Sequence, residues 1–482
     1  MSSPASSVAK LFRVLAPSAL TLTIGACAVV PNVGPAPTLV APADLATQRS
    51  FTAPEADWPA ERWWEAYNDP QLGGLIDEAL RGSPSLAQAQ ARLRRAQALA
   101  QQARASTLPT LQFDGEVAYS EISREQGFPP EFQAFLPQGY HDTGRVALNA
   151  SYDLDLFGKN RAALAAAVSE TAAAGADAAQ TRLTLSTAVA QAYGQLAQLA
   201  AERESAAQTV ANRAASIELV SQRVRNGVDT QAELQQARAA QPTAQAELDL
   251  LDERILLARH QLAALLGEGP DRGLDIALPK TEAVKAFGLP PNLAVNLVGR
   301  RPDIVAARLR AEAAGSRIKV AHAAFYPNIT LNAYIGQQAL GLDKLFNPTA
   351  AIGSIGPAIT LPIFDGGQRA GAYRGARADY DAAVAAYDQT LVQALQDVAD
   401  AAASVQASQR QLADREQALV AGEAAYSVAQ LRYRGGLSTY VALLIAEDAV
   451  IAQRRAVADA RTRAFLLDIA LVRALGGGYA GS

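Results

Sequence analysis

The sequence predicts a mainly α-helical protein with a small β part, built from two tandem repeats, whose strands enter a barrel shared between several copies of the chain. Three observations lead to this fold class. Motifs recur at a regular offset, two very long stretches lack Pro and nearly lack Gly, and four short runs alternate between apolar and polar residues. The 482 residues are 50% hydrophobic but only 6% aromatic, which favours long, closely packed helices over an aromatic-rich globule.

Composition and motifs exclude several classes of function. The formal net charge of −4 gives no basic footprint for nucleic acid. The single Cys cannot form an internal disulfide or a Cys-rich zinc site, and His141, His260 and His322 show no ligand spacing. P-loop, HExxH and GxSxG motifs are absent. We therefore expect no catalytic residue, no cofactor and no resident metal, and the protein is not expected to be an enzyme.

The N-terminus carries an export signal. Lys10 and Arg13 precede an apolar run at 14–24, which is too short to span a bilayer and is typical of a signal peptide. The letters IGAC at 24–27 span the end of the signal and the residue after it, and this segment resembles a bacterial lipobox in which Cys27 is acylated. An ordinary signal peptide with an incidental Cys is the alternative. By the same resemblance, Ala28 after the Cys favours the outer membrane, and stable anchoring takes two acyl chains such as palmitate.

The two halves of the chain repeat each other. The segment around Pro84 matches that around Pro302 at an offset of 218, and the segment 223–230 matches 432–439 at an offset of 209. The shrinking offset makes the loop at about 121–142 longer than its counterpart, and we expect both loops on the outside of the cell. Repeats of this kind define the architecture. The predicted divisions are a signal peptide (1–26), a lipidated linker (27–70), repeat 1 (71–267), an equatorial connector (268–300), repeat 2 (301–476) and a tail (477–482).

Each repeat predicts a helix, two strands, a very long helix, a turn and a returning helix. Pro84 and Pro302 suit the first turn of a helix, where the missing N–H is not needed. Very long helices are predicted at 160–225 and 368–434, about 100 Å each, which implies coiled-coil packing. The chain then returns along 230–266 and 439–475.

The four alternating runs predict strands. They lie near 111–120, 145–154, 329–335 and 351–361, with Pro357 suggesting a bulge. The alternation fits transmembrane barrel strands and fits half-buried sandwich strands equally well.

In a membrane, four strands cannot close into a barrel, and lipid tolerates no open sheet edge. Several protomers must then share one barrel, with their long helices projecting away from the membrane. The side chains expected in a wet lumen are Gln112, Asp114, Glu116 and Asn149, and those expected to face lipid are Phe113 and Tyr119.

Three segments are similar to TolC-type outer-membrane efflux lipoproteins. They are RRPDI at 300–304 continuing to AAFYPNI at 323–329, LPIFDGG at 361–367, and RYRGGLSTY at 432–440. The resemblance implies a trimer in which each protomer gives four strands to one outer-membrane barrel and its long helices to one periplasmic tunnel. It also implies a passive duct in a tripartite pump, with a periplasmic adaptor and an inner-membrane transporter of the resistance–nodulation–division class as partners.

The resemblance directs attention to the turns of the two long hairpins. Those turns would meet the adaptor, through Arg225, Asn226, Gly227, Arg434, Gly435 and Gly436. Simple solvation is the alternative for the arginines at 223, 225, 432 and 434.

The same resemblance predicts a gate at this end. Relatives carry an acidic residue at the position of Ile445, so the usual acidic ring is in doubt here. Val441, Ile445 and Asp448 share one helix face, which predicts an apolar collar followed by a ring of Asp448 carboxylates, whereas Glu447 points about 100° away.

By resemblance, Arg432 and Tyr433 would tie this helix pair to its neighbour and hold the resting tunnel closed. In the alternative interpretation of the gate, Val441 and Ile445 are coiled-coil core residues and Asp448 is a solvated charge.

Other functions remain open from the sequence. A duct for type I secretion or metal-ion efflux is the alternative to one for drug efflux. A structural coiled-coil lipoprotein would share the signal and the helices but would not need strands with one lipid-facing side. A lipid-tethered periplasmic enzyme would need a catalytic constellation, which the sequence lacks.

Overall fold

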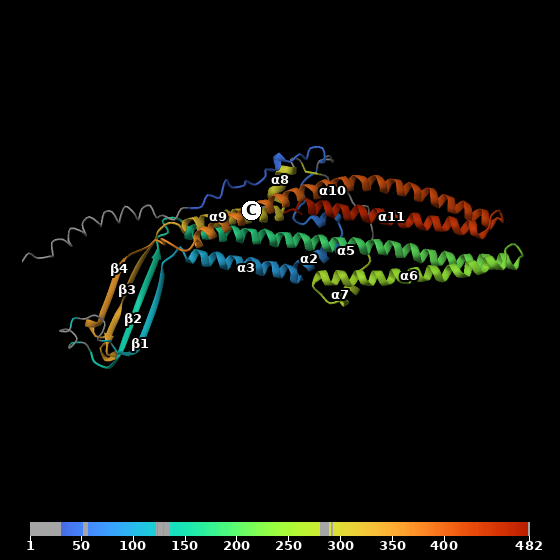
Figure 1. Ribbon diagram of the computed structural model, residues 1–482. Coiled ribbons are helices and arrows are strands. Elements are labelled where there is room, and N and C mark those ends of the chain that lie inside the picture. Colours follow the sequence, from blue (N-terminus) through green and yellow to red (C-terminus); the bar gives the residue numbers. More distant parts are fainter. Residues whose placement is uncertain are drawn as a thin grey trace, which may run out of the picture. The chain divides into compact units, whose positions relative to one another are not determined.

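The computed structural model describes residues 30–51, 56–121, 123, 129, 135, 137–279, 289–290 and 293–480. Cys27 and most of the loop predicted at 121–142 lie outside this part of the chain. Figure 1 shows the described elements, which are long helices, one sheet and short helical turns. In chain order they are η1 (Pro42–Asp44), η2 (Trp63–Tyr67), α2 (Pro70–Gly82), α3 (Pro84–Ala105), β1 (Thr110–Glu121), β2 (Tyr140–Asp153), α5 (Lys159–Arg225), α6 (Gln231–Leu266), α7 (Asp271–Leu274), α8 (Leu293–Arg300), α9 (Pro302–Ala323), β3 (Asn328–Leu340), η3 (Leu342–Lys344), η4 (Pro348–Ala350), β4 (Ala351–Thr360), α10 (Gln368–Arg434) and α11 (Tyr440–Ala474).

The same order of elements occurs twice. The series α3, β1, β2, α5, α6 is followed by α9, β3, β4, α10, α11. Pro84 and Pro302 are the first residues of α3 and α9, as their fixed φ favours. The two long helices have the same length of 67 residues, and they begin and end within a residue of the predicted limits.

The chain divides into two compact units. One contains Met1–Thr38, Arg94–Ala172 and Leu309–Ala385, and the other contains Leu39–Leu93, Ala173–Arg308 and Ala386–Ser482. The first unit holds the sheet. The second holds the hairpin turns of the long helices.

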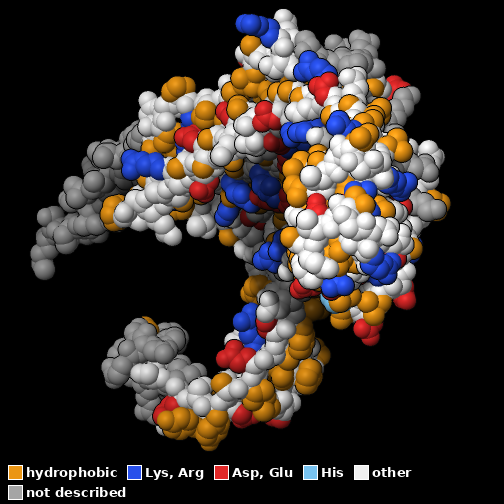
Figure 2. All heavy atoms as spheres, turned by 90° about the vertical axis from the view of Figure 1, so that its right-hand side faces the viewer, with side chains coloured by type: hydrophobic (Ala, Val, Ile, Leu, Met, Phe, Trp, Pro, Cys, Tyr) orange, Lys and Arg blue, Asp and Glu red, His pale blue; other side chains and the backbone are white. Residues whose placement is uncertain are grey.

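The sheet has one apolar and one polar face. Its strand order is β1-β2-β3-β4, with every pair antiparallel. The register places Phe113 opposite Leu148, and Leu148 opposite Ile335. These three side chains are 68%, 44% and 69% exposed, so the apolar face has no cover within the described chain. Figure 2 shows hydrophobic side chains along one side of the sheet and charged ones on the other.

The opposite face is polar and hydrogen-bonded across the strands. Gln112 Nε2 donates to Asp114 Oδ1 over 2.6 Å, and Asn149 Nδ2 donates to the other oxygen of Asp114. Ser151 Oγ donates to Asn332 Oδ1 over 3.0 Å. The polar residues predicted to line a lumen therefore share one face, opposite the residues predicted to meet lipid.

The bulge predicted at Pro357 is wrong. Pro357 pairs with Leu331, and the register of β3 with β4 continues from Asn328–Thr360 to Gln337–Ala351 without an extra residue. The reason is that β4 is an edge strand of the sheet within the described chain, and a missing N–H is tolerated on an edge strand.

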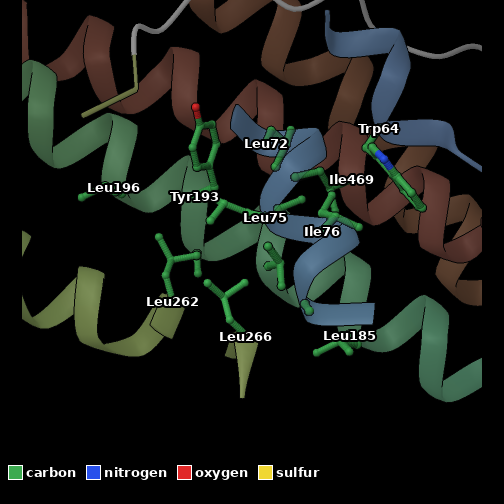
Figure 3. Packing of buried hydrophobic residues seen from close by; sticks show 14 of the residues in the cluster. Trp64, Leu72, Leu75, Ile76, Leu185, Tyr193, Leu196, Leu262, Leu266 and Ile469 are labelled. Atoms are coloured by element: carbon green, nitrogen blue, oxygen red, sulfur yellow. The ribbon is translucent and has the colours of Figure 1, made fainter. Parts of the chain in front are cut away.

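The second unit has an aliphatic and aromatic core. Leu72, Leu75 and Ile76 of α2 belong to one buried cluster with Leu262 and Leu266 of α6 (Figure 3). This short helix begins sharply because the side chain of its N-cap residue, Asp69, accepts hydrogen bonds from the backbone N–H groups of positions 71 and 72. Among the described helices, none is both long and apolar enough to cross a bilayer.

The two faces of the sheet should differ in their tolerance of charge. We expect Leu148→Lys to cost about 2–4 kcal/mol if the residue lies at mid-bilayer, and so to reduce the amount of assembled protein in the membrane fraction. The matched control is Asn149→Lys, which places the same charge beside Asp114 on the polar face. Quantifying the heat-stable oligomer on unboiled gels tests this. Equal losses in both variants would refute the assignment of the faces.

Candidate functional site

The candidate site is formed by the turns that close the two long hairpins. Gly227 and Gly436 adopt φ of +71° and +76°, which few other residues tolerate. Thr230 and Thr439 then cap α6 and α11, because each hydroxyl accepts a backbone N–H three residues on. Both turns therefore occur where the sequence predicts them, with the same local construction.

A hydrogen-bonded tie joins the first hairpin to the second. Arg223 Nε and Nη2 donate to the two oxygens of Asp229 over 2.8 and 3.0 Å. Arg223 Nη1 donates to the carbonyl oxygen of Tyr433 over 2.9 Å, and the hydroxyl of Tyr433 donates to Asp229 Oδ2 over 2.5 Å. The guanidinium carbon also lies 4.5 Å from the centre of the Tyr433 ring, within the range of a cation–π contact.

Buried aromatic and aliphatic side chains surround the tie. The Tyr433 and Tyr440 side chains are fully buried, with ring centres 5.9 Å apart, and Leu234 and Leu443 belong to the same cluster. Burial raises the pKa of Tyr433, and its hydrogen bond to Asp229 adds to that rise. Burial also acts to raise the pKa of Asp229, but the hydrogen bonds from Arg223 and Tyr433 outweigh it, so that this pKa is lowered. Asp229 is therefore a carboxylate at neutral pH.

A second charged cluster lies between α5 and α11. Arg213 of α5 places Nη1 3.0 Å from Glu447 Oε2 and Nη2 2.6 Å from Asp448 Oδ1, both on α11. Only 5% of the Arg213 side chain and 4% of the Glu447 side chain are exposed, against 63% for Asp448. Burial raises the pKa of Glu447, Arg213 opposes that shift, and the charge of Asp448 adds to it.

Within the described chain no group of three or more His, Cys, Asp or Glu side chains is placed to hold a metal ion.

The helix face predicted to line the gate is exposed. Val441 and Ile445 are 43% and 65% exposed, and Asp448 lies on the same face. Glu447 is buried on another face of α11. This placement agrees with the helical spacing, and it leaves Val441 and Ile445 outside the apolar core of the described chain. That these residues line a pore remains a prediction.

The arginines of the two turns differ in their surroundings. Arg225, Arg432 and Arg434 are exposed, and Arg225 lies 3.6 Å from the equally exposed Glu218. Arg223 is instead held in the tie. The predicted adaptor contacts at 225–227 and 434–436 are all exposed.

Sequence reasoning missed three members of the site, Asp229, Arg213 and Tyr440. Asp229 had a local signal, because it directly precedes the Thr that caps α6. Arg213 had none, since its partners lie more than 200 positions away. Tyr440 reads as an ordinary first-turn residue, although its ring is 1% exposed.

The chain matches one protein family over most of its length. The family model described as "Outer membrane efflux protein" matches residues 75–268 and 293–477. These ranges span both repeats.

Several proteins are similar to the chain. It is 38% identical over 320 residues to the fusaric acid resistance protein FusA of Burkholderia cepacia, covering 65% of this chain and 59% of that protein. It is 29% identical over 467 residues to the multidrug resistance outer membrane protein MdtP of Shigella flexneri, covering 95% of each. The crystal structure of the outer membrane protein VceC of Vibrio cholerae is 44% identical, with a TM-score of 0.81, covering 87% of this chain and 100% of that one.

The buried Arg213–Glu447 pair should matter far more than an exposed pair. Arg213→Met leaves Glu447 buried without its partner, which costs about 3–5 kcal/mol when a buried pair is broken this way. Arg225→Met removes an exposed pair with Glu218 and should cost at most about 1 kcal/mol. Thermal unfolding of the purified protein measures both, and adding Glu447→Gln to Arg213→Met should recover most of the loss.

The pH dependence of the same variant has a defined sign. Without Arg213 the pKa of Glu447 rises further, so the native state holds a proton that the unfolded chain releases. The free energy of unfolding of Arg213→Met therefore falls as pH rises. The difference in this free energy between the unchanged protein and the variant should be larger at about pH 8 than at about pH 5. A deficit that shrinks as pH rises would contradict the assignment of Glu447 as the buried partner.

Proposed function

Because the chain belongs to the outer membrane efflux protein family, we propose that it serves a tripartite pump, receiving cargo through a periplasmic adaptor from an inner-membrane transporter of the resistance–nodulation–division class. The protein is an outer-membrane efflux channel that extends into the periplasm. The fold class of the family is a trimeric channel with a β-barrel and a helical barrel. Members of the family are ducts, and no catalytic step is assigned to this chain.

The exported cargo is proposed to be small organic molecules. One relative is named for resistance to fusaric acid and another for multidrug resistance. A duct for another export system, such as type I secretion or metal-ion efflux, is the alternative.

The adaptor is proposed to dock on the two hairpin turns. They are exposed and repeat the same local structure. An exposed arginine beside each turn can donate hydrogen bonds to carboxylate or carbonyl groups of a partner. The contacts would be made by Arg225, Asn226, Gly227, Arg434, Gly435 and Gly436.

The observation that carries the gating proposal is the tie of Arg223, Asp229 and Tyr433. It links α10 to the first hairpin of the same protomer, so the two hairpins cannot separate at their tips while it is intact. Arg432, exposed beside Tyr433, is available to contact a neighbouring protomer. Opening of the tip therefore requires that these contacts break. Docking of the adaptor would break them.

The constriction is proposed to combine an apolar collar with a partly neutralised ring. Val441 and Ile445 form the collar, and Asp448 follows on the same face. Because Arg213 lies 2.6 Å from Asp448, each carboxylate attracts cations less than a free one would. A modest cation preference is the expected consequence.

Reconstituted channels test the assignment of the pore face. Asp448→Asn should lower the cation preference measured from reversal potentials in a salt gradient, because it removes the exposed charge. Glu447→Gln is the matched control, since that carboxylate is buried away from the proposed pore, and it should leave the preference nearly unchanged. The pore face is misassigned if the preference survives the first change and falls with the second.

Cys27 is proposed to carry the lipid anchor. It is the only Cys of the chain and follows Gly-Ala at the end of the export signal. Mass spectrometry of the N-terminal peptide of the mature protein should find Cys27 first, with a diacylglyceryl thioether and an acylated amine. Cys27→Ser should abolish the lipid and leave the signal unprocessed at this position. A free thiol at Cys27 in the mature protein would exclude the anchor.

A further inference from the structure

A pocket of about 380 Å³ lies where strands and helices meet in the sheet-bearing unit. Its walls come from the connection after β2, the connection before β3 and the connection after β4. The first turns of α5 and α10 complete it. Neither the tie nor the proposed gate uses any of its residues.

One wall of the pocket is aromatic. The rings of Phe157 and Tyr326 stack with centres 4.7 Å apart and planes 15° apart. Their side chains remain 47% and 39% exposed, so the stack keeps accessible ring surface. A planar ring that extended the stack would bury that apolar surface in a favourable offset geometry.

A second wall carries cationic groups. Arg369 donates through Nε to Asp365 Oδ2 over 2.5 Å, and 11% of its side chain is exposed. Its Nη1 is buried and finds no acceptor among the described residues. A buried donor without an acceptor costs about 1–3 kcal/mol, and an anionic group at this point would remove the cost. The exposed Lys159 lines the same pocket.

The pocket also contains a carboxylate, Asp155. Its oxygens accept hydrogen bonds from the backbone N–H groups of Asn160 and Arg161, each over 2.9 Å, and from the Arg161 side chain over 3.3 Å. Asp155 is thus engaged in capping α5. These donors balance the charge of Asp155, so that Lys159 and Nη1 of Arg369, which has no acceptor among the described residues, are left for a ligand.

The strand register shows which face of the sheet the pocket adjoins. Asn328 and Thr360 line the pocket and pair directly across β3 and β4. Because side chains alternate along a strand, both lie on the face opposite Leu331 and Ile359, which is the polar face. In a barrel whose apolar face meets lipid, the polar face lines the duct. A lipid headgroup would approach from the other face.

We propose that this pocket binds planar organic anions, in particular aromatic carboxylates, as they pass along the duct. The ring would extend the Phe157–Tyr326 stack, and the carboxylate would accept from Arg369 Nη1 and from Lys159. The inference rests on the proposed function, because only in a duct does the polar face beside the pocket meet the exported cargo. Binding is weak, with a dissociation constant on the order of 1 mM, because a site in a duct must release what it binds.

Binding of 2-naphthoate to the purified full-length trimer in detergent tests the proposal. Saturation-transfer NMR and calorimetric titration should detect 2-naphthoate. The neutral isostere 2-naphthalenemethanol and the non-planar anion cyclohexanecarboxylate should bind at least about tenfold more weakly, since each lacks one of the two interactions. Equal binding of all three compounds would overturn the site.

Variants locate the site. Phe157→Leu and Lys159→Gln change exposed side chains, and each should weaken 2-naphthoate binding about threefold to tenfold. Arg369→Gln should weaken 2-naphthoate binding more than either of these changes. If Arg369→Gln disturbs the start of α10, Phe157→Leu and Lys159→Gln alone decide whether the pocket is the binding site. Arg317→Gln is the control, because it removes an exposed cation of the same unit, paired with Glu170, outside the pocket. Affinity unchanged in both Phe157→Leu and Lys159→Gln would refute the proposal.

Conductance separates this inference from the proposed function. A trimer that conducts ions in bilayers but does not bind 2-naphthoate overturns the pocket and leaves the duct intact. A trimer that binds 2-naphthoate through Phe157 and Lys159 but does not conduct supports the pocket and contradicts the duct.

Discussion

The backbone of the two outer strands imposes the constraint on which the rest of the architecture depends. Within the described chain β1 and β4 are the edges of the sheet, so each presents a row of N–H and C=O groups without a strand partner. In lipid every unpaired group of this kind costs several kcal/mol. The exposed apolar face of the sheet, by contrast, is stable only in contact with lipid. Only pairing between copies of the chain satisfies both demands, which is the physical reason that the protomers of this family share one barrel.

The hairpins face the opposite difficulty, because they stand in water and their long helices are rich in Ala. Small side chains permit close approach but bury little apolar area for each residue. Near the turns, the described contacts between the hairpins include polar and aromatic groups, such as the tie of Arg223, Asp229 and Tyr433, whereas an apolar cluster joins α5 to α11 elsewhere. Ties of this kind are specific in geometry and can be broken by a partner that competes for their donors. The gate proposed at these turns would need both properties.

Local rules predict the elements of this chain well and its long-range contacts poorly. The limits of α5 and α10 follow from the absence of Pro and the Gly-containing turns, and the exposed face of Val441, Ile445 and Asp448 follows from the helical period. The bulge at Pro357 was wrong because sequence cannot tell an edge strand from a central one. The partnership of Arg213 with Glu447 could not be predicted, because it depends on how two hairpins pack.

The polar ties exist because the two repeats have diverged at matching positions. At the offset of 209 that relates the hairpins, Arg223 corresponds to Arg432, yet Asp229 corresponds to Ser438 and Val224 to Tyr433. One arginine is therefore held by a carboxylate within the chain, while its counterpart stays exposed. At the same offset, Arg213 corresponds to Gly422, and Glu447 corresponds to Arg238. Two identical hairpins would offer each other the same charges, so divergence is what allows one protomer to join its two hairpins through Arg223, Asp229 and Tyr433 and still leave Arg432 exposed.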